Sequence, residues 1–157
     1  MNFKIRLFGL LTICIGLSCG TLGGIGPTLY FPTSKIKLEQ AFSRLYVEHP
    51  EYNVPENWKK YDTWSERGYD FLEGRIFYFK TPPEEMYYVS FIGDSADLAD
   101  PNQIGIAIRA IYTNEKSKWL LGDELSNREK DRITNRFNKN IISKLEGYTK
   151  SKASEEF

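Results

Sequence analysis

The stretch Arg75–Ile92, RIFYFKTPPEEMYYVSFI, decides the fold of this chain. It contains two runs of aromatic and β-branched residues, Arg75–Lys80 and Met86–Ile92, and between them lies the short Pro-rich segment TPPEE. Aromatic and β-branched side chains favour the pleated surface of a sheet, and a short connection joins antiparallel neighbours. The stretch therefore predicts a β-hairpin.

A further strand is predicted downstream of the hairpin, and the residues upstream of it leave two possibilities open. In residues 104–113 the large apolar residues Ile104, Ile106 and Ile108 alternate with Gly105, Ala107 and Arg109, which is the period of a strand with one apolar face. Upstream, Tyr69–Leu72 is either a strand of its own or the start of a long first strand. We expect an antiparallel sheet of three or four strands.

Helical periodicity flanks the sheet on both sides. After Thr33 and Ser34, apolar residues recur at i, i+3, i+4 and i+7, which predicts a helix that ends by Pro50. Ser126 and Glu129 form a capping box for a second helix, which Gly147 is expected to end. We therefore predict a single α+β domain over residues 33–147, with an N-terminal and a C-terminal helix on one face of the sheet, followed by a polar tail at 148–157.

Composition excludes several classes of function. The 157 residues contain 21 Lys and Arg and 21 Asp and Glu, without a basic stripe, so nucleic-acid binding has no support. The only cysteines are Cys14 and Cys19, so the domain has neither a disulfide nor a cysteine metal site. The single histidine, His49, is expected to stabilise the C-terminal end of the first helix. We expect no metal and no cofactor.

The first seventeen residues are built like a signal peptide. Lys4 and Arg6 give a positive start, and Leu7–Leu17, LFGLLTICIGL, is an uncharged apolar run. The next residues complete the segment Gly16-Leu17-Ser18-Cys19, which resembles the lipobox of bacterial lipoproteins, although Gly16 and Leu17 stand where that family usually has Leu and a small residue. We therefore expect a signal peptide at residues 1–18.

The lipobox resemblance implies an acylated Cys19 and cleavage just before it, with membrane lipid as the partner of Cys19. The protein would then lie on the extracytoplasmic side of the cell envelope, at the outer membrane if the cell has one, with residues 19–32 as lipidated Cys19 and a flexible, Gly-rich tether. The alternative is an uncleaved transmembrane helix, because residues 7–31 carry no charge and are long enough to span a bilayer.

An aromatic segment precedes the hairpin and is the best binding candidate in the sequence. It contains Trp58, Tyr61, Trp64 and Tyr69, interleaved with Lys and Arg, a composition typical of binding hot spots. An envelope protein or a glycan is the partner that such a platform would suit. The other interpretation is that these rings cover the open end of a small core.

The carboxylates do not form a recognisable catalytic or metal motif. Glu84 and Glu85 lie in the Pro-rich turn, where solvated side chains are expected, and the acidic loop at residues 94–102 lacks the spacing of an EF-hand. No catalytic residue is therefore assigned, and we expect a non-catalytic binding or interaction module. The rival class is an envelope hydrolase that uses carboxylates such as Glu73 or Asp94.

Overall fold

The computed structural model describes residues 24–64 and 73–155. Their elements are, in chain order, β1 (Ile25–Phe31), α1 (Lys35–Glu48), η1 (Pro50–Tyr52), η2 (Glu56–Tyr61), β2 (Gly74–Phe79), β3 (Glu85–Ile92), α2 (Ser95–Ala99), β4 (Ile104–Thr113), β5 (Lys118–Leu120), η4 (Gly122–Glu124), α3 (Asn127–Phe137), the π-helical turn η5 (Asn138–Ile142) and α4 (Ser143–Thr149). None of the helices in these two ranges is long and apolar enough to span a bilayer.

The predicted α+β class and the antiparallel sheet are confirmed, but the sheet has five strands. Its order is β1-β4-β3-β2, and β5 pairs with β4. The hairpin is β2 and β3, in which Gly74 pairs with Ser90 and Phe79 with Glu85. The predicted downstream strand is β4, which pairs with β1, β3 and β5. The strand considered at Tyr69–Leu72 lies outside the described residues.

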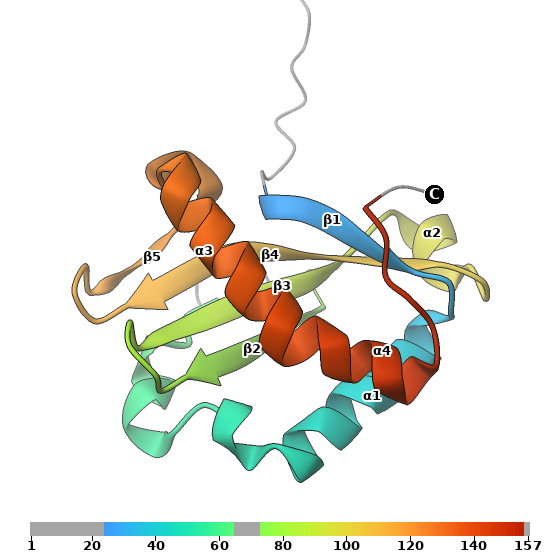
Figure 1. The fold of residues 1–157 in the computed structure, drawn as a ribbon, viewed down its shortest axis with the longest axis horizontal. Coiled ribbons are helices and arrows are strands. Elements are labelled where there is room, and N and C mark those ends of the chain that lie inside the picture. The colour runs from blue at the N-terminus through green and yellow to red at the C-terminus, as the bar shows by residue number, and fades with distance from the viewer. Residues whose placement is uncertain (1–23, 65–72, 156–157) are drawn as a thin grey trace, which may run out of the picture.

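Helices cover one face of the sheet, as predicted. Figure 1 shows α3, η5 and α4 as one continuous rod that crosses the sheet obliquely, with α1 beside its C-terminal end. The main core lies between these helices and the sheet, and its fully buried residues include Phe31, Leu38, Phe42, Phe77, Tyr87, Ile106, Ile133, Phe137 and Leu145. Both capped helix starts are as expected, since Ser34 accepts a hydrogen bond from the Lys37 N–H and Ser126 forms a capping box with Glu129.

The segment expected as a flexible tether at residues 19–32 contains β1. Ile25, Leu29 and Phe31 are buried in the main core, so this segment loses apolar surface to the sheet and cannot remain a free linker. Its glycines suggested flexibility, but Gly26 adopts a φ of +79° at the register shift between Ile25 and Leu29. A left-handed backbone favours glycine, so Gly26 allows the irregular backbone at this point of β1.

The polar tail expected at residues 148–157 is also part of the fold as far as residue 155. The helix does not end at Gly147 but continues to Thr149, and Lys150 follows in the left-handed conformation that terminates it. The chain then returns to β1, where Tyr30 and Ser154 exchange two backbone hydrogen bonds of 2.8 and 3.0 Å. The C-terminal segment thus covers part of the outer edge of β1.

Gly26 gives a direct test of the packing of β1. A Cβ atom at this position would lie 2.4 Å from Thr134 Oγ1 on α3, and the φ of +79° is strained for any L side chain. We expect Gly26→Ala to lower the free energy of unfolding by at least about 1–2 kcal/mol. Chemical denaturation followed by circular dichroism measures the change.

Gly147→Ala is the matched control. A Cβ at Gly147 meets nothing within 4 Å, and the residue lies inside α4. Alanine is the better helix former, so this variant should be neutral or more stable by up to about 1 kcal/mol. Equal effects of the two substitutions would contradict the described packing of β1 against α3.

Candidate functional site

The aromatic segment that precedes the hairpin packs against the second face of the sheet. Trp58 and Trp64 are 3% and 7% exposed, and Tyr61 is partly buried beside them. They form a second core with Tyr78, Met86, Tyr88, Ala110, Tyr112 and Trp119. Stacked rings hold it together, with centroids 4.2 Å apart for Trp64 and Tyr88 and 4.5 Å apart for Tyr61 and Tyr112.

This burial corrects the expectation that Trp58 and Trp64 form a binding platform. A ring that binds a sugar or a partner must be exposed, and neither tryptophan ring is. The backbone also fixes the segment, because the Trp119 indole N–H donates a 2.8 Å hydrogen bond to the Tyr61 carbonyl oxygen. The structure fits the other interpretation, in which these rings cover a small core. Tyr69 lies outside the described residues, as does Cys19.

The second core predicts a stability effect for Trp58. Its ring lies edge-on to Tyr78 and Tyr112, at centroid distances of 5.2 and 5.8 Å. We expect Trp58→Ala to lower the free energy of unfolding by about 3–5 kcal/mol. Lys60→Ala, two residues along the same segment but exposed, should change it by less than about 0.5 kcal/mol. A Trp58→Ala variant as stable as wild type would show that the ring does not pack as described.

The carboxylates singled out in the sequence have structural partners. Asp94 accepts hydrogen bonds from the N–H groups of Ala96 and Asp97 and forms the capping box of α2. Glu73 forms an ion pair with Lys35 at 2.5 Å. Within the two described ranges, no three His, Cys, Asp or Glu side chains come together as a metal site would require. His49 ends α1, and its Nδ1 lies 3.1 Å from Glu51 Oε1.

The most unusual polar group is Glu85, which the sequence placed in a solvated turn. Its side chain is 1% exposed, although it stands at the first position of β3. Arg132 of α3 binds it with two hydrogen bonds, from Nη1 at 2.9 Å and Nη2 at 2.6 Å, and Arg136 adds a third at 3.1 Å. The Tyr87 hydroxyl donates a fourth at 3.0 Å. The carboxylate is therefore buried but well satisfied.

The same arginines connect the hairpin turn to α3. Arg136 donates to the carbonyl oxygens of Thr81 and Pro83 and to the Thr81 hydroxyl, at 2.5–2.7 Å. Burial raises the pKa of the Tyr87 hydroxyl well above its usual value, so this group stays protonated as a donor. The hydrogen bonds to Glu85 raise the pKa of Arg132. We call Glu85, Tyr87, Arg132 and Arg136 the Glu85 cluster.

A surface pocket of about 340 Å³ opens beside the Glu85 cluster. Its lining residues are Pro83, Glu84, Glu85, Ile111, Thr113, Asn114, Glu115, Lys116, Leu120, Glu129 and Arg132. Arg132 is 38% exposed and uses two of its five N–H groups on Glu85, while Lys116 supplies a second cation. Carboxylates and Thr113 and Asn114 supply acceptors, so the pocket can bind a small polar group through both donors and acceptors.

The carboxylates around this pocket are poorly suited to acid–base chemistry. Glu85 is held by two arginines, and Glu84 accepts a hydrogen bond from the Tyr78 hydroxyl. Hydrogen bonds from Ser126 lower the pKa of Glu129, which keeps it ionised as a helix cap. A general acid needs a raised pKa, so the lowered pKa of Glu129 does not suit it to that role. Glu84, Glu85 and Glu129 therefore all have partners within the fold.

Comparison with known proteins gives no family assignment. No protein-family model, curated protein or solved structure matches this chain.

Sequence reasoning missed the Glu85 cluster because its members are far apart in the chain. Arg132 and Arg136 lie 47 and 51 residues from Glu85. The one local signal was the spacing of Arg132 and Arg136, which places both guanidinium groups on the same side of α3.

Removal of both arginines should strongly destabilise the fold. The double variant Arg132→Met and Arg136→Met leaves Glu85 buried without a cation, and we expect a loss of about 3–5 kcal/mol at neutral pH. Adding Glu85→Gln removes the uncompensated charge and should restore a large part of that loss. Chemical denaturation of the three proteins measures both steps.

Lys59→Met is the control for the Glu85 cluster, because Lys59 pairs with Glu56 on the surface, where both side chains are more than half exposed. Its effect should stay below about 1 kcal/mol. If the triple variant were no more stable than the double variant, the buried charge would not be the cause of the loss.

Proposed function

We propose that this chain is a membrane-anchored extracytoplasmic lipoprotein, acylated at Cys19, whose domain is a non-catalytic binding module. The proposed anchor rests on the N-terminal sequence, which has a positively charged start, the uncharged run Leu7–Leu17, and Ser18-Cys19 directly after it. The domain that follows has no cysteine of its own, which leaves Cys14 and Cys19 as the only thiols of the chain.

The support for binding rather than catalysis comes from the carboxylates. Each acidic side chain that we considered for hydrolysis has a structural partner: Lys35 for Glu73, the α2 backbone for Asp94 and two arginines for Glu85. The pocket beside the Glu85 cluster offers paired donors and acceptors in a concave surface, which suits recognition of a polar ligand or partner segment. An envelope hydrolase remains the rival class.

Cys19→Ser tests the anchor. We expect wild-type protein to carry lipid and to have the mass of a chain cleaved before Cys19, while Cys19→Ser accumulates at full length without lipid. The reason is that only a thiol can form the thioether to the diacylglyceryl group, and a serine hydroxyl cannot replace it. Metabolic labelling with a fatty acid, together with the mass of the intact protein, measures both effects.

Cys14→Ser is the matched control, because it removes the only other thiol in the chain and leaves Cys19 in place. It should be processed and labelled like wild type. Full-length, unlabelled wild-type protein in the membrane fraction would contradict the lipoprotein and favour an uncleaved helix over residues 7–31.

The pocket is tested with Lys116→Glu and Glu115→Lys, two exposed lining residues that take no part in the Glu85 cluster. Recovery of envelope components from detergent extract by these variants is compared with recovery by wild type and by Lys37→Glu, an exposed change on α1. Loss of a component with the pocket variants alone supports binding at this site. Equal recovery by all four proteins would contradict it.

A further inference from the structure

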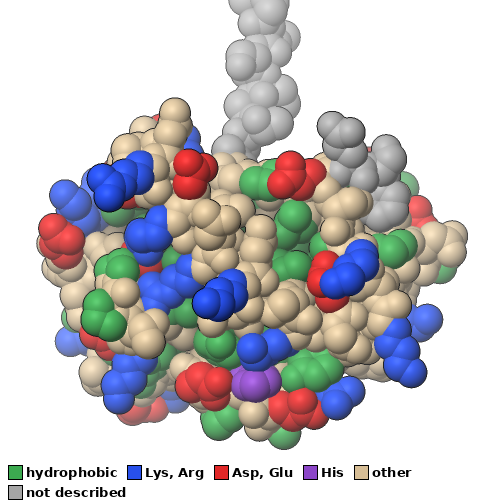
Figure 2. Space-filling view, viewed as in Figure 1, with side chains coloured by type: hydrophobic (Ala, Val, Ile, Leu, Met, Phe, Trp, Pro, Cys, Tyr) green, Lys and Arg blue, Asp and Glu red, His purple; other side chains and the backbone are tan. Residues whose placement is uncertain are grey.

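Charge is unevenly distributed between the C-terminal rod and the rest of the domain. Residues 127–152 contain eight Lys and Arg against three Asp and Glu, a net charge of +5, and the other described residues contain ten against fifteen, a net charge of −5. From residue 132 to residue 145 the helical rod carries four cations and no acid. Figure 2 shows Lys and Arg spread across the face over this rod.

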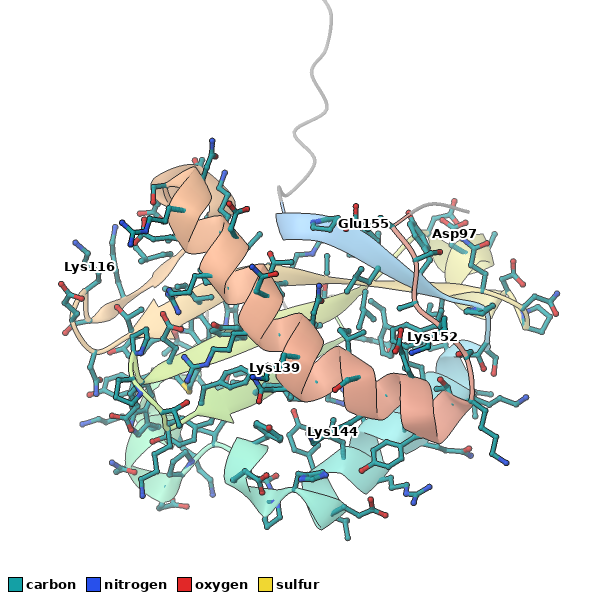
Figure 3. The ribbon with its side chains drawn as sticks, in the orientation of Figure 1. Asp97, Lys116, Lys139, Lys144, Lys152 and Glu155 are labelled. Atoms are coloured by element: carbon teal, nitrogen blue, oxygen red, sulfur yellow. The ribbon has the colours of Figure 1, made fainter. Side chains whose placement is uncertain are left out.

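Five of these cations are Arg128, Lys130, Lys139, Lys144 and Lys150. We call Arg128, Lys139, Lys144 and Lys150 the basic helical face, because Lys130, two positions after Arg128, points to another side of α3. Arg128, Lys139 and Lys150 are exposed, and Figure 3 labels Lys139 and Lys144 on the rod. No ion pair joins any of the five to a carboxylate of the described residues, whereas Arg132 and Arg136 bind Glu85 and Lys152 binds Glu146. Asp131 is an exposed acid on the same rod. The basic helical face is therefore available for an outside anion.

The strand that follows the proposed anchor begins beside this face. The described chain starts at Gly24, five residues after Cys19, and five residues span at most about 18 Å when fully extended. Gly26 lies directly against Thr134 of α3, so β1 begins beside the rod (Figure 1). At about 1.5 Å per helical residue, Arg128 and Lys139 lie within roughly 10 Å of Thr134 along the axis. An anchor at Cys19 thus keeps these cations near the bilayer.

We propose that the basic helical face lies on the anionic lipid headgroups of the membrane that holds Cys19. This inference rests on the proposed function, since it takes the anchor from there. Cations within about 10 Å of an anionic surface are attracted at moderate ionic strength, and a link of at most about 18 Å lets the basic helical face come inside that range. The large exposed apolar side chains, Ile36, Val47 and Leu121, lie elsewhere, so this face lacks the apolar anchors of a protein interface.

The test uses the whole protein, purified from membranes and reconstituted through its own N-terminus into vesicles. One set contains phosphatidylcholine only, and the other contains phosphatidylcholine with phosphatidylglycerol. A water-soluble amine-reactive reagent labels the lysines, and mass spectrometry gives the rate at each position. Lys139 and Lys150 should react several-fold more slowly on the anionic vesicles, and the difference should disappear at about 1 M salt, where the Debye length is about 3 Å.

Lys37 and Lys60, which are exposed on α1 and η2, are the internal controls and should react equally in both sets. The variant Lys139→Glu and Lys150→Glu should abolish the protection of Lys144, and the variant Lys37→Glu and Lys60→Glu, with the same change of charge, should preserve it. Equal rates at Lys139 and Lys150 on the two vesicles would overturn the proposal. So would protection by dissolved polyphosphate without protection by anionic vesicles.

Flotation of the protein with phosphatidylcholine vesicles tests membrane anchoring separately from the basic helical face. A protein that does not float contradicts the proposed anchor. In that case, comparing lysine labelling with and without added anionic vesicles still tests whether the basic helical face binds anionic lipid. A protein that floats but shows no protection of its lysines contradicts the proposed role of the basic helical face and still agrees with the proposed anchor. The two proposals can therefore fail independently.

Discussion

The two central strands must be covered on both faces, and this requirement organises the rest of the structure. All residues of β3 except Ile92 are buried, and in β4 only Arg109 and Thr113 are not. A sheet of this kind cannot leave one side to water, because its alternating side chains are apolar on both. The helices cover one side, and the segment with Trp58, Tyr61 and Trp64 covers the other. The two cores therefore explain both the helical layer and the aromatic composition.

The sequence was most informative where the signal is local. The hairpin, β4 and the starts of α1 and α3 followed from alternation, helical spacing and capping residues, all of which lie within a few positions of each other. The sequence was least informative where a partner that is distant in the chain determines the local structure. β1 resembled a linker because Gly26, Pro27 and the glycines just before it outweighed three apolar residues, and only pairing with β4 makes it a strand. The aromatic segment fitted two interpretations until the second face of the sheet was known.

Glu85 illustrates why the candidate site could not be predicted. A Glu after two prolines and another Glu is ordinary turn composition, and exposure is the usual outcome for it. Its burial depends on two guanidinium groups that arrive from α3, about fifty residues later. The cost of removing a carboxylate from water is met only when both cations are in place. The cluster thus fixes the position of α3 relative to the hairpin, and with it the pocket between them.

The pairing of β1 with segments that come much later in the chain has a consequence for the order of folding. β1 is synthesised first among the strands, but its neighbour β4 begins about eighty residues later, and Ser154, which closes its other edge at Tyr30, comes almost at the end. Contacts of such long separation form late, after the entropy of closing a large loop has been lost. β1 therefore waits unpaired until β4 has emerged, and its outer edge stays open until Ser154 has. A nascent chain cut short before residue 104 leaves β1 without its partner strand.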